Sequence, residues 1–180
     1  MVNKKIFISI GMIFCMCFTC SCGRQHLYSN NDEIITTVGE AIVQDFINND
    51  FEGIKEYLSP KALETADLYE GFSYIHGLLT ESEIVNVEQK GTPISGHKEK
   101  GASWEKGSTS FHITMSSGVT YCLYFEYWFV NQIDEEMLGV SRVEIFNNDE
   151  ADETYDLNKF SSYIGIYNPG WGDFLKVSDN

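Results

Sequence analysis

Four of the five cysteines in this chain lie near its start and could bind a metal ion or form disulfides. They are Cys15, Cys17, Cys20 and Cys22. Their context argues against both kinds of chemistry, because they lie in or at the end of an apolar run over residues 6–20 that follows Lys4 and Lys5. This is the layout of a secretory signal. An exported segment that is then removed cannot keep a thiolate cage, so we predict no metal and no cofactor.

The apolar run has about fifteen residues, whereas a helix that crosses a membrane needs about 20. We therefore expect a signal peptide over residues 1–21, with a single-pass membrane anchor as the alternative. Residues 18–23 resemble the lipobox of bacterial lipoproteins, in which small residues precede a cysteine that receives a diacylglyceryl group before cleavage. Cys22 fits best, and Cys20 stays an alternative because the lipobox prefers leucine where this chain has Thr19. The resemblance implies lipidation of Cys22 and anchoring at the cell membrane, facing outside the cytoplasm.

The rest of the chain is acidic and has the length of one domain. Residues 22–31 are short and polar, as in a tether, and residues 32–180 hold ample apolar material for a single core. Without Lys4 and Lys5 the chain has 10 basic and 27 acidic residues, a formal charge of −17. Such a surface repels nucleic acid and anionic lipid headgroups, so we expect no nucleic-acid partner and contact with the membrane only through the lipid. Cys122 is alone in the folded part, which excludes an internal disulfide there.

The periodicity of apolar residues predicts helices first along the chain and strands afterwards. Helical spacing occurs in three segments: 32–49, 50–58 and 60–80. The alternation typical of strands occurs in four segments: 83–88, 108–115, 119–131 and 138–147. Residues 91–107 are rich in glycine and lysine, so we expect a long loop there. After residue 148 we expect an irregular tail that packs on the domain.

The turn at residues 116–118 sets a register for the predicted sheet, because it suits a three-residue hairpin with glycine in the left-handed position. If Met115 pairs with Val119, one face of the sheet collects large apolar side chains. These are Phe111, Ile113, Tyr121, Leu123, Phe125 and Tyr127, joined by Ser141, Val143 and Ile145 from the next strand. The opposite face is mixed and holds His112, Thr114, Cys122, Tyr124, Glu126, Trp128, Val140, Arg142 and Glu144.

These elements make an α+β fold in which three N-terminal helices pack on a curved antiparallel sheet of about four strands. The order resembles the cone-like fold shared by nuclear transport factor 2 and ketosteroid isomerase. Residues 69–72, 121–128 and 138–140, which read YEGF, YCLYFEYW and LGV, are similar to a family of uncharacterised lipoproteins from Gram-positive gut bacteria. The likeness runs from about residue 34 to 147 and consists of core and turn positions. It implies the fold and the location, and it brings no catalytic residues.

The mixed face of the sheet supplies one candidate site, a surface for a protein partner or a homodimer. Its residues are His112, Tyr124, Glu126, Trp128 and Arg142. In the register above Glu126 stands opposite Arg142, which favours the charged form of both side chains. Aromatic side chains beside such a pair are typical of protein interfaces. The plainer interpretation is a solvated outer face with an ordinary ion pair.

The interior of the cone supplies a second candidate, a small pocket. Its residues are Tyr69, Tyr74, His76, Tyr121 and Tyr127. Isomerase chemistry of the ketosteroid type needs a carboxylate base and a phenol or acid donor that converge on one oxygen. The predicted inward face has tyrosines but no Asp or Glu, so we assign no catalytic residue and favour a protein that is not an enzyme. Tyrosine-rich core packing explains the same residues more simply.

Together these patterns predict a lipid-anchored extracytoplasmic protein that binds a small ligand or a protein partner without catalysis. Two alternatives stay open at this point. One is a small-pocket enzyme of the isomerase or dehydratase type. The other is an immunity-type protein that neutralises a toxin at the membrane.

Overall fold

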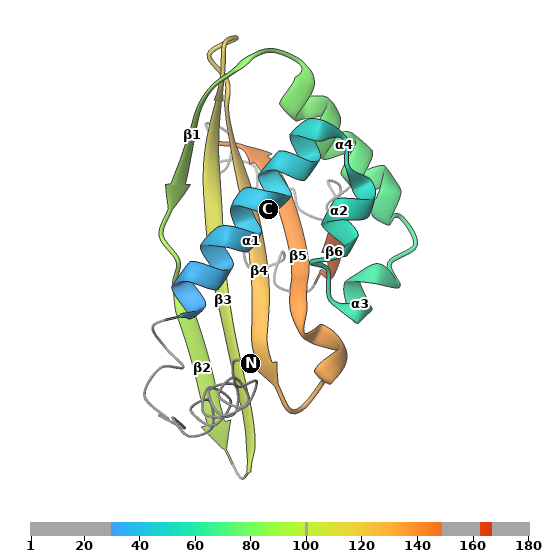
Figure 1. Ribbon diagram of the computed structural model, residues 1–180, viewed down its shortest axis with the longest axis vertical. Coiled ribbons are helices and arrows are strands. Elements are labelled where there is room, and N and C mark those ends of the chain that lie inside the picture. The colour runs from blue at the N-terminus through green and yellow to red at the C-terminus, as the bar shows by residue number, and fades with distance from the viewer. Residues whose placement is uncertain (1–29, 100, 149–162, 167–180) are drawn as a thin grey trace, which may run out of the picture.

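The computed structural model describes residues 30–99, 101–148 and 163–166. The predicted signal peptide with Cys22, most of the tether and most of the C-terminal tail lie outside the described residues. Within the described part, every helix is too short or too polar to cross a membrane. The fold there is α+β: helices come first along the chain, and a mostly antiparallel sheet follows (Figure 1).

Four α-helices occur in the described part of the chain. They are α1 (Asn31–Asn48), α2 (Phe51–Lys55), α3 (Pro60–Leu63) and α4 (Leu68–Thr80). The first two match the predicted segments, whereas the helix predicted over residues 60–80 is divided into α3 and α4. A residue between the two helices makes a long-range contact that the local sequence pattern cannot predict. The Thr65 hydroxyl donates a hydrogen bond at 3.3 Å to the carbonyl oxygen of Ile164, which lies 99 positions further along the chain.

Ser59 fixes the start of α3 and is completely buried. Its hydroxyl accepts a hydrogen bond from Ala62 N at 3.1 Å, as an N-cap does. We expect Ser59→Ala to lower the free energy of unfolding by about 1–2 kcal/mol, because the Ala62 N–H loses its partner inside the protein. Asp67→Ala is the matched control and should stay within about 0.5 kcal/mol, since Asp67 precedes α4 without a side-chain cap bond. Urea unfolding measures both variants, and equal losses would contradict the expected role of Ser59.

The sheet has six strands among the described residues, two more than the sequence predicts. They are β1 (Ile84–Lys90), β2 (Ile94–Glu99), β3 (Ala102–Met115), β4 (Thr120–Asn131), β5 (Gly139–Asn147) and β6 (Gly165–Ile166), with a 3-10 helix, η1 (Glu135–Met137), between β4 and β5. The strand order is β1-β3-β4-β5-β6, and β2 pairs with the other half of β3 on the same side as β1. Of the strands in the described part of the chain, only β6 runs parallel to its neighbour.

The prediction of a long loop over residues 91–107 is wrong. β2 and the first half of β3 form a hairpin there, and Gly101 at φ 92° makes its turn. Gly107 contributed to the prediction of a loop, but it lies inside β3, where side chains of α1 and β4 come close to the backbone of the strand. A Cβ on Gly107 would lie 3.1 Å from Ile35 Cδ1 of α1 and 3.1 Å from Phe129 Cε2 of β4. The glycine therefore lets helix and sheet approach each other.

The predicted register of the central strands is confirmed. Met115 N donates to Val119 O at 2.8 Å, and Glu126 and Arg142 stand opposite each other across β4 and β5. The predicted faces of β5 are wrong at Val140 and Ser141, because Ser141 is an extra residue that forms a bulge between Val140 and Arg142. Val140 is consequently part of the fully buried core. Ser141 lies toward the opposite face, with its hydroxyl 3.3 Å from Glu126 Oε1.

One face of the sheet is covered by helices and filled with apolar side chains. α1 crosses β3 and β4 on this face, and the shorter helices lie beside β5 and β6 (Figure 1). The closest approach is at Gly39 of α1, where a Cβ would lie 2.4 Å from Phe125 Cζ and 2.6 Å from Phe111 Cε2. Both rings are buried, and their centroids are 6.2 Å apart. The centre of this face is thus occupied by packed rings.

Candidate functional site

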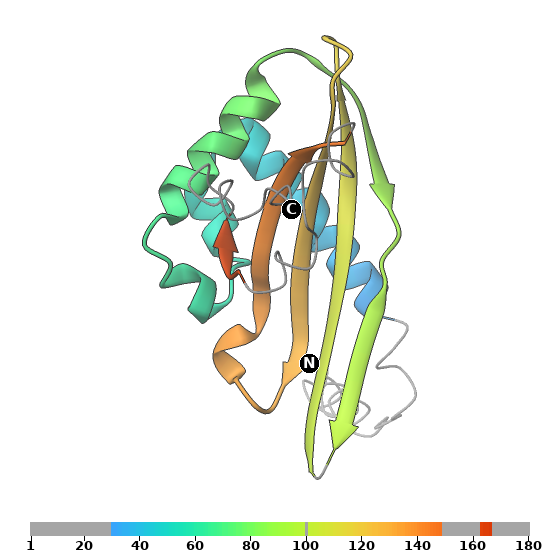
Figure 2. The same ribbon diagram turned by 180° about the vertical axis from the view of Figure 1, so that it is seen from behind.

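The predicted partner surface lies on the outer face of the sheet, which no described helix covers (Figure 2). Four of its five residues lie together on β4 and β5: Tyr124, Glu126, Trp128 and Arg142. His112 is on the same face but further along β3, opposite Cys122. The sheet therefore brings together the charge pair and two aromatic residues, and it leaves His112 apart from them.

Glu126 is the centre of this group. Its carboxylate accepts hydrogen bonds from Lys106 Nζ at 2.6 Å, from Trp128 Nε1 at 3.1 Å and from Ser141 Oγ at 3.3 Å. Lys106 Nζ also lies 5.0 Å from the centroid of the Trp128 ring. The sequence does not place Lys106 in this group, because the pattern of residues 91–107 predicts a loop. It places Ser141 on the core face, because the alternation in β5 does not reveal the bulge.

Arg142 connects Glu126 to a second carboxyl group, that of Glu144. Arg142 Nε lies 3.1 Å from Glu144 Oε1, and Arg142 Nη2 lies 4.0 Å from Glu126 Oε2. The Arg142 Nη2 group also donates to the Tyr124 hydroxyl at 3.3 Å. Burial raises the pKa of the Glu144 carboxyl to about 8, against the opposing effect of Arg142 and reinforced by the nearby charge of Glu126.

Lys106, Glu126, Arg142 and Glu144 form an ion network in which the guanidinium and the two carboxyl groups are largely shielded from water, whereas the Lys106 side chain is 31% exposed. The side chains of Arg142 and Glu126 are 8% and 14% exposed, and that of Glu144 is 3% exposed. Ionisable groups at this depth are tolerated in folded proteins when they are paired. The network therefore ties β3, β4 and β5 together, and the half-buried rings of Tyr124 and Trp128 are its accessible part.

Cys122 also lies on the outer face and has the chemistry of a buried thiol. Burial raises the pKa of this thiol to about 11, although a hydrogen bond with Ser110 acts in the opposite direction. A thiol that keeps its proton at neutral pH is a poor nucleophile. Within the described residues, His, Cys, Asp and Glu side chains nowhere gather in the groups of three or more that a metal ion needs.

The five residues of the predicted pocket lie on α4 and β4. Tyr69, Tyr74 and His76 belong to α4, and Tyr121 and Tyr127 lie six positions apart on β4. Tyr69 is 63% exposed and packs edge-on against Phe51. His76 Nδ1 is hydrogen-bonded to Phe46 O at 2.6 Å, while the Tyr127 ring lies 4.9 Å from that of Phe129. Tyr69 and His76 also both stack on the Phe72 ring, with centroid distances of 6.3 and 6.2 Å, so these two side chains take part in the aromatic packing of the helices.

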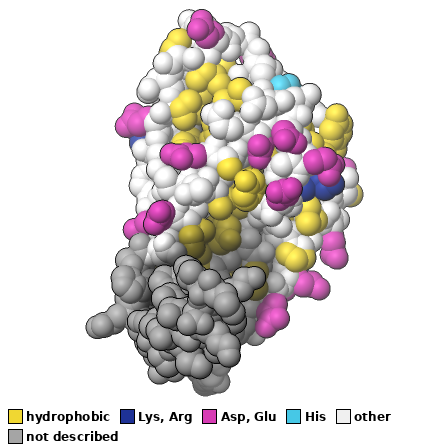
Figure 3. All heavy atoms as spheres, in the orientation of Figure 1, with side chains coloured by type: hydrophobic (Ala, Val, Ile, Leu, Met, Phe, Trp, Pro, Cys, Tyr) yellow, Lys and Arg dark blue, Asp and Glu magenta, His cyan; other side chains and the backbone are white. Residues whose placement is uncertain are grey.

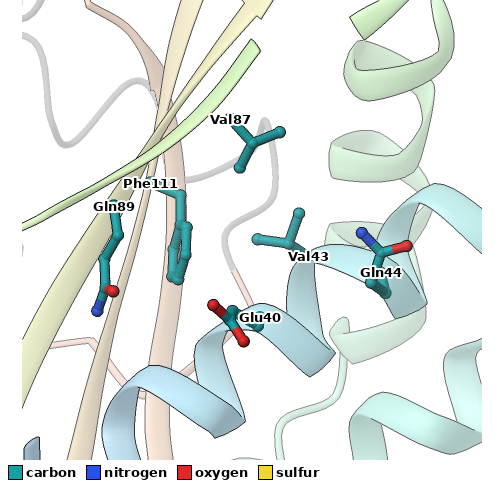
Figure 4. A pocket seen from close by; sticks show the side chains of 6 residues that line it. All are labelled: Glu40, Val43, Gln44, Val87, Gln89 and Phe111. Carbon is teal, nitrogen blue, oxygen red and sulfur yellow. The ribbon is translucent and has the colours of Figure 1, made fainter. Parts of the chain in front are cut away.

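A hollow that the sequence does not predict lies between α1 and the edge of the sheet (Figure 4). It is lined by Glu40, Val43 and Gln44 of α1, by Val87 and Gln89 of β1, and by Phe111 of β3. Val43 and Phe111 are buried and form an apolar floor, whereas Glu40 and Gln44 are exposed at the rim. The hollow combines apolar and polar groups as binding sites do.

Gln89 is held in place at the side of this hollow. Its Nε2 group donates to Thr36 Oγ1 of α1 at 2.9 Å and to Thr109 Oγ1 of β3 at 3.2 Å. These bonds join the helix to the edge of the sheet. Apolar Val85 and Val87 alternate in the sequence and indicate the strand β1. They do not indicate the hollow, because the facing residues of α1 meet this strand only in the folded chain.

The structure thus defines an α+β domain with a filled helix-covered face, an ion network on the other face and an open hollow at one edge. Residues 41–148 match the family described as a domain of unknown function, DUF5104. This match covers more than half of the chain, so the protein belongs to that family. All residues of the ion network lie within the matched part. A comparison with curated proteins gave no match.

Proposed function

We propose that this protein is a lipid-anchored extracytoplasmic domain that binds a small ligand or a protein partner and catalyses no reaction. The packing at Gly39 is the observation that favours binding over catalysis. The rings of Phe111 and Phe125 fill the part of the helix-covered face that would hold the substrate in a cone-like enzyme. Binding then falls to the hollow beside α1 and to the half-buried aromatic residues of the outer face.

The proposed location, anchored to the membrane and outside the cytoplasm, is supported by the N-terminal sequence. Lys4 and Lys5, the apolar run and the lipobox-like residues 18–23 are together typical of lipoprotein precursors. A relationship to lipoproteins of Gram-positive gut bacteria and a cone like that of nuclear transport factor 2 are the finer parts of the proposal. They are supported by the motif at residues 121–128 and by the order of helices and sheet.

An isomerase or dehydratase would use a buried carboxyl group with a raised pKa, and Glu144 is such a group. In this fold, however, it lies on the outer face, away from the helices that would close a cone. Its carboxyl group is in contact with Arg142, which also binds Tyr124 and Glu126. The acid is engaged in the ion network, and this favours the binding role over the enzyme.

Lipidation at Cys22 is tested with the full chain in a bacterium that processes lipoproteins. The wild type and Cys20→Ser should both yield a product that begins at Cys22 and carries a diacylglyceryl group. Cys22→Ser should keep its leader, because position 22 then has no thiol for the thioether that precedes cleavage. Intact-mass spectrometry distinguishes these products. A wild type that retains its leader would contradict the proposed location, and the reverse behaviour of the two variants would move the site to Cys20.

A further inference from the structure

Among the described residues, the edge of the sheet along β1 is open. β1 pairs with β3 on one side, and no described residue pairs with it on the other. The backbone groups of successive residues alternate between the two sides of a strand. The Lys90 carbonyl faces β3, because it accepts a hydrogen bond from Thr109 Oγ1 at 3.2 Å. By alternation, the N–H and C=O groups of Val87 and Gln89 point to the open edge, where they can accept a further strand.

The hollow beside α1 lies next to these edge-facing backbone groups. The side chains of Val87 and Gln89 line it together with Val43 and Gln44 of α1 (Figure 4). A residue that pairs directly with Val87 in an added antiparallel strand places its side chain on the same face of the sheet. That face is the one with the hollow. Edge and hollow therefore offer main-chain hydrogen bonds and a side-chain pocket to one extended segment, which is how peptides bind by strand addition.

The charges around this site favour a basic segment over a second copy of the chain. Glu40 is exposed at the rim of the hollow, and the nearest cation of β1, Lys90, is already paired with Glu88 at 2.5 Å. Asp and Glu side chains predominate over Lys and Arg on the face seen in Figure 3. Without its leader the chain has a formal charge of −17, so two copies repel each other and a cationic peptide is attracted.

We propose that an extended basic peptide adds to β1 as an antiparallel strand and places an apolar side chain in the hollow beside α1. This inference rests on the binding role proposed above and gives that role a site and a class of partner. It also gives a use to the exposed apolar residues of the edge. The side chains of Val85 and Val87 are 59% and 41% exposed, and such an edge is otherwise a liability.

The test uses the full chain and a fluorescein-labelled heptapeptide of alternating lysine and valine, with lysine at both ends. In antiparallel pairing with Val87 and Gln89, the peptide's valines face the hollow and their N–H groups point at β1. N-methylation of the valines should weaken binding at least about tenfold, because hydrogen bonds to the edge are lost. N-methylation of the inner lysines, whose N–H groups point to solvent, should change binding less than about threefold. Fluorescence anisotropy measures both peptides.

Two charge reversals locate the peptide on the protein. Glu40→Lys should weaken binding of the unmethylated peptide about fivefold, because it replaces an attraction at the rim by a repulsion. Glu136→Lys makes the same charge change on η1, beside the far strands of the sheet, and should leave the affinity within about twofold. A heptapeptide of alternating glutamate and valine should bind at least about tenfold more weakly than the lysine peptide.

Several outcomes would overturn strand addition at β1. Equal binding of the two N-methylated peptides would exclude hydrogen bonding to the β1 edge. Equal effects of Glu40→Lys and Glu136→Lys would exclude the hollow as the place where the peptide binds. If the full chain dimerises in analytical ultracentrifugation and the dimer does not bind the lysine peptide, the edge belongs to a second copy.

The binding role proposed for the whole domain is judged separately. If the lysine peptide does not bind, and another ligand binds the full chain with an affinity that Glu40→Lys does not change, only the proposal of strand addition is rejected. An unmodified Cys22 would contradict the proposed location whether or not the peptide binds.

Discussion

Gly39→Val is expected to lower the free energy of unfolding by about 3 kcal/mol or more. A Cβ at Gly39 would lie 2.4 Å from Phe125 Cζ and 2.6 Å from Phe111 Cε2, which is too close for any real contact. The two rings are buried and nearly parallel, with an interplanar angle of 12°, so neither can move aside without opening the core. Close-packed interiors resist added volume of this kind. Urea unfolding should show a lower midpoint with an unchanged slope.

Gly77→Val is the matched control for this substitution. Gly77 lies within α4 as Gly39 lies within α1, so both substitutions change the intrinsic helix propensity equally and by only a few tenths of a kcal/mol. A Cβ at Gly77 would meet no atom within 4 Å. We expect the control to stay within about 0.5 kcal/mol of the wild type. Should Gly39→Val be as stable as Gly77→Val, the helix-covered face has space at its centre and the case against an enclosed pocket is lost.

The parts of the fold that the sequence predicts are those fixed by local geometry. The pairing of Met115 with Val119 follows from a three-residue turn, and the opposition of Glu126 and Arg142 follows from continuing the alternation into β5. A shift by one residue would turn every side chain to the other face, so an apolar pattern specifies the register strongly. For this reason the core face of β3 and β4 was predicted in detail.

The parts that the sequence does not predict depend on contacts between distant residues. Glycine has the same local signature in a loop and at a close approach, and only the position of Ile35 and Phe129 identifies Gly107 as the second kind. The bulge at Ser141 puts Val140 in place of Ser141 on the core face, and the glycine beside it, Gly139 at the start of β5, does not by itself distinguish a bulge from a turn. β6 has two residues and pairs parallel to β5, and so short a strand has no alternation to detect.

The candidate site was predicted in the same partial way. Alternation along β4 placed Tyr124, Glu126 and Trp128 on one face, and the register added Arg142. The sequence does not predict how deeply the side chains of the ion network are buried, because the residues of a strand that point away from the core are normally exposed to solvent. Nor could it supply the hollow, whose walls come from a helix and an edge strand that meet only through the docking of α1.

Glu144→Gln is expected to be more stable than the wild type at about pH 9 and equally stable at about pH 5. In the folded protein, burial raises the pKa of Glu144 from its ordinary value of 4.5 to about 8, only partly opposed by Arg142. Between these values the folded state holds a proton that the unfolded state releases. The stability from this group is therefore fully present below pH 4.5 and is lost as the pH rises through 8. Glutamine keeps the shape and does not titrate, so the variant should gain about 3 kcal/mol on the wild type across this range.

Glu135→Gln on η1 is the control for this prediction, since Glu135 is exposed and outside the ion network, and it should leave the pH dependence of unfolding unchanged. Urea unfolding of both variants and the wild type from about pH 5 to about pH 9 gives the comparison. The opposite sign is physically possible, because a guanidinium 3.1 Å away favours the carboxylate. If the wild type instead gains stability relative to Glu144→Gln as the pH rises, the contact with Arg142 outweighs burial. The outer face would then carry a permanent charge at Glu144, and the Arg142 guanidinium would lie between two ionised carboxylates.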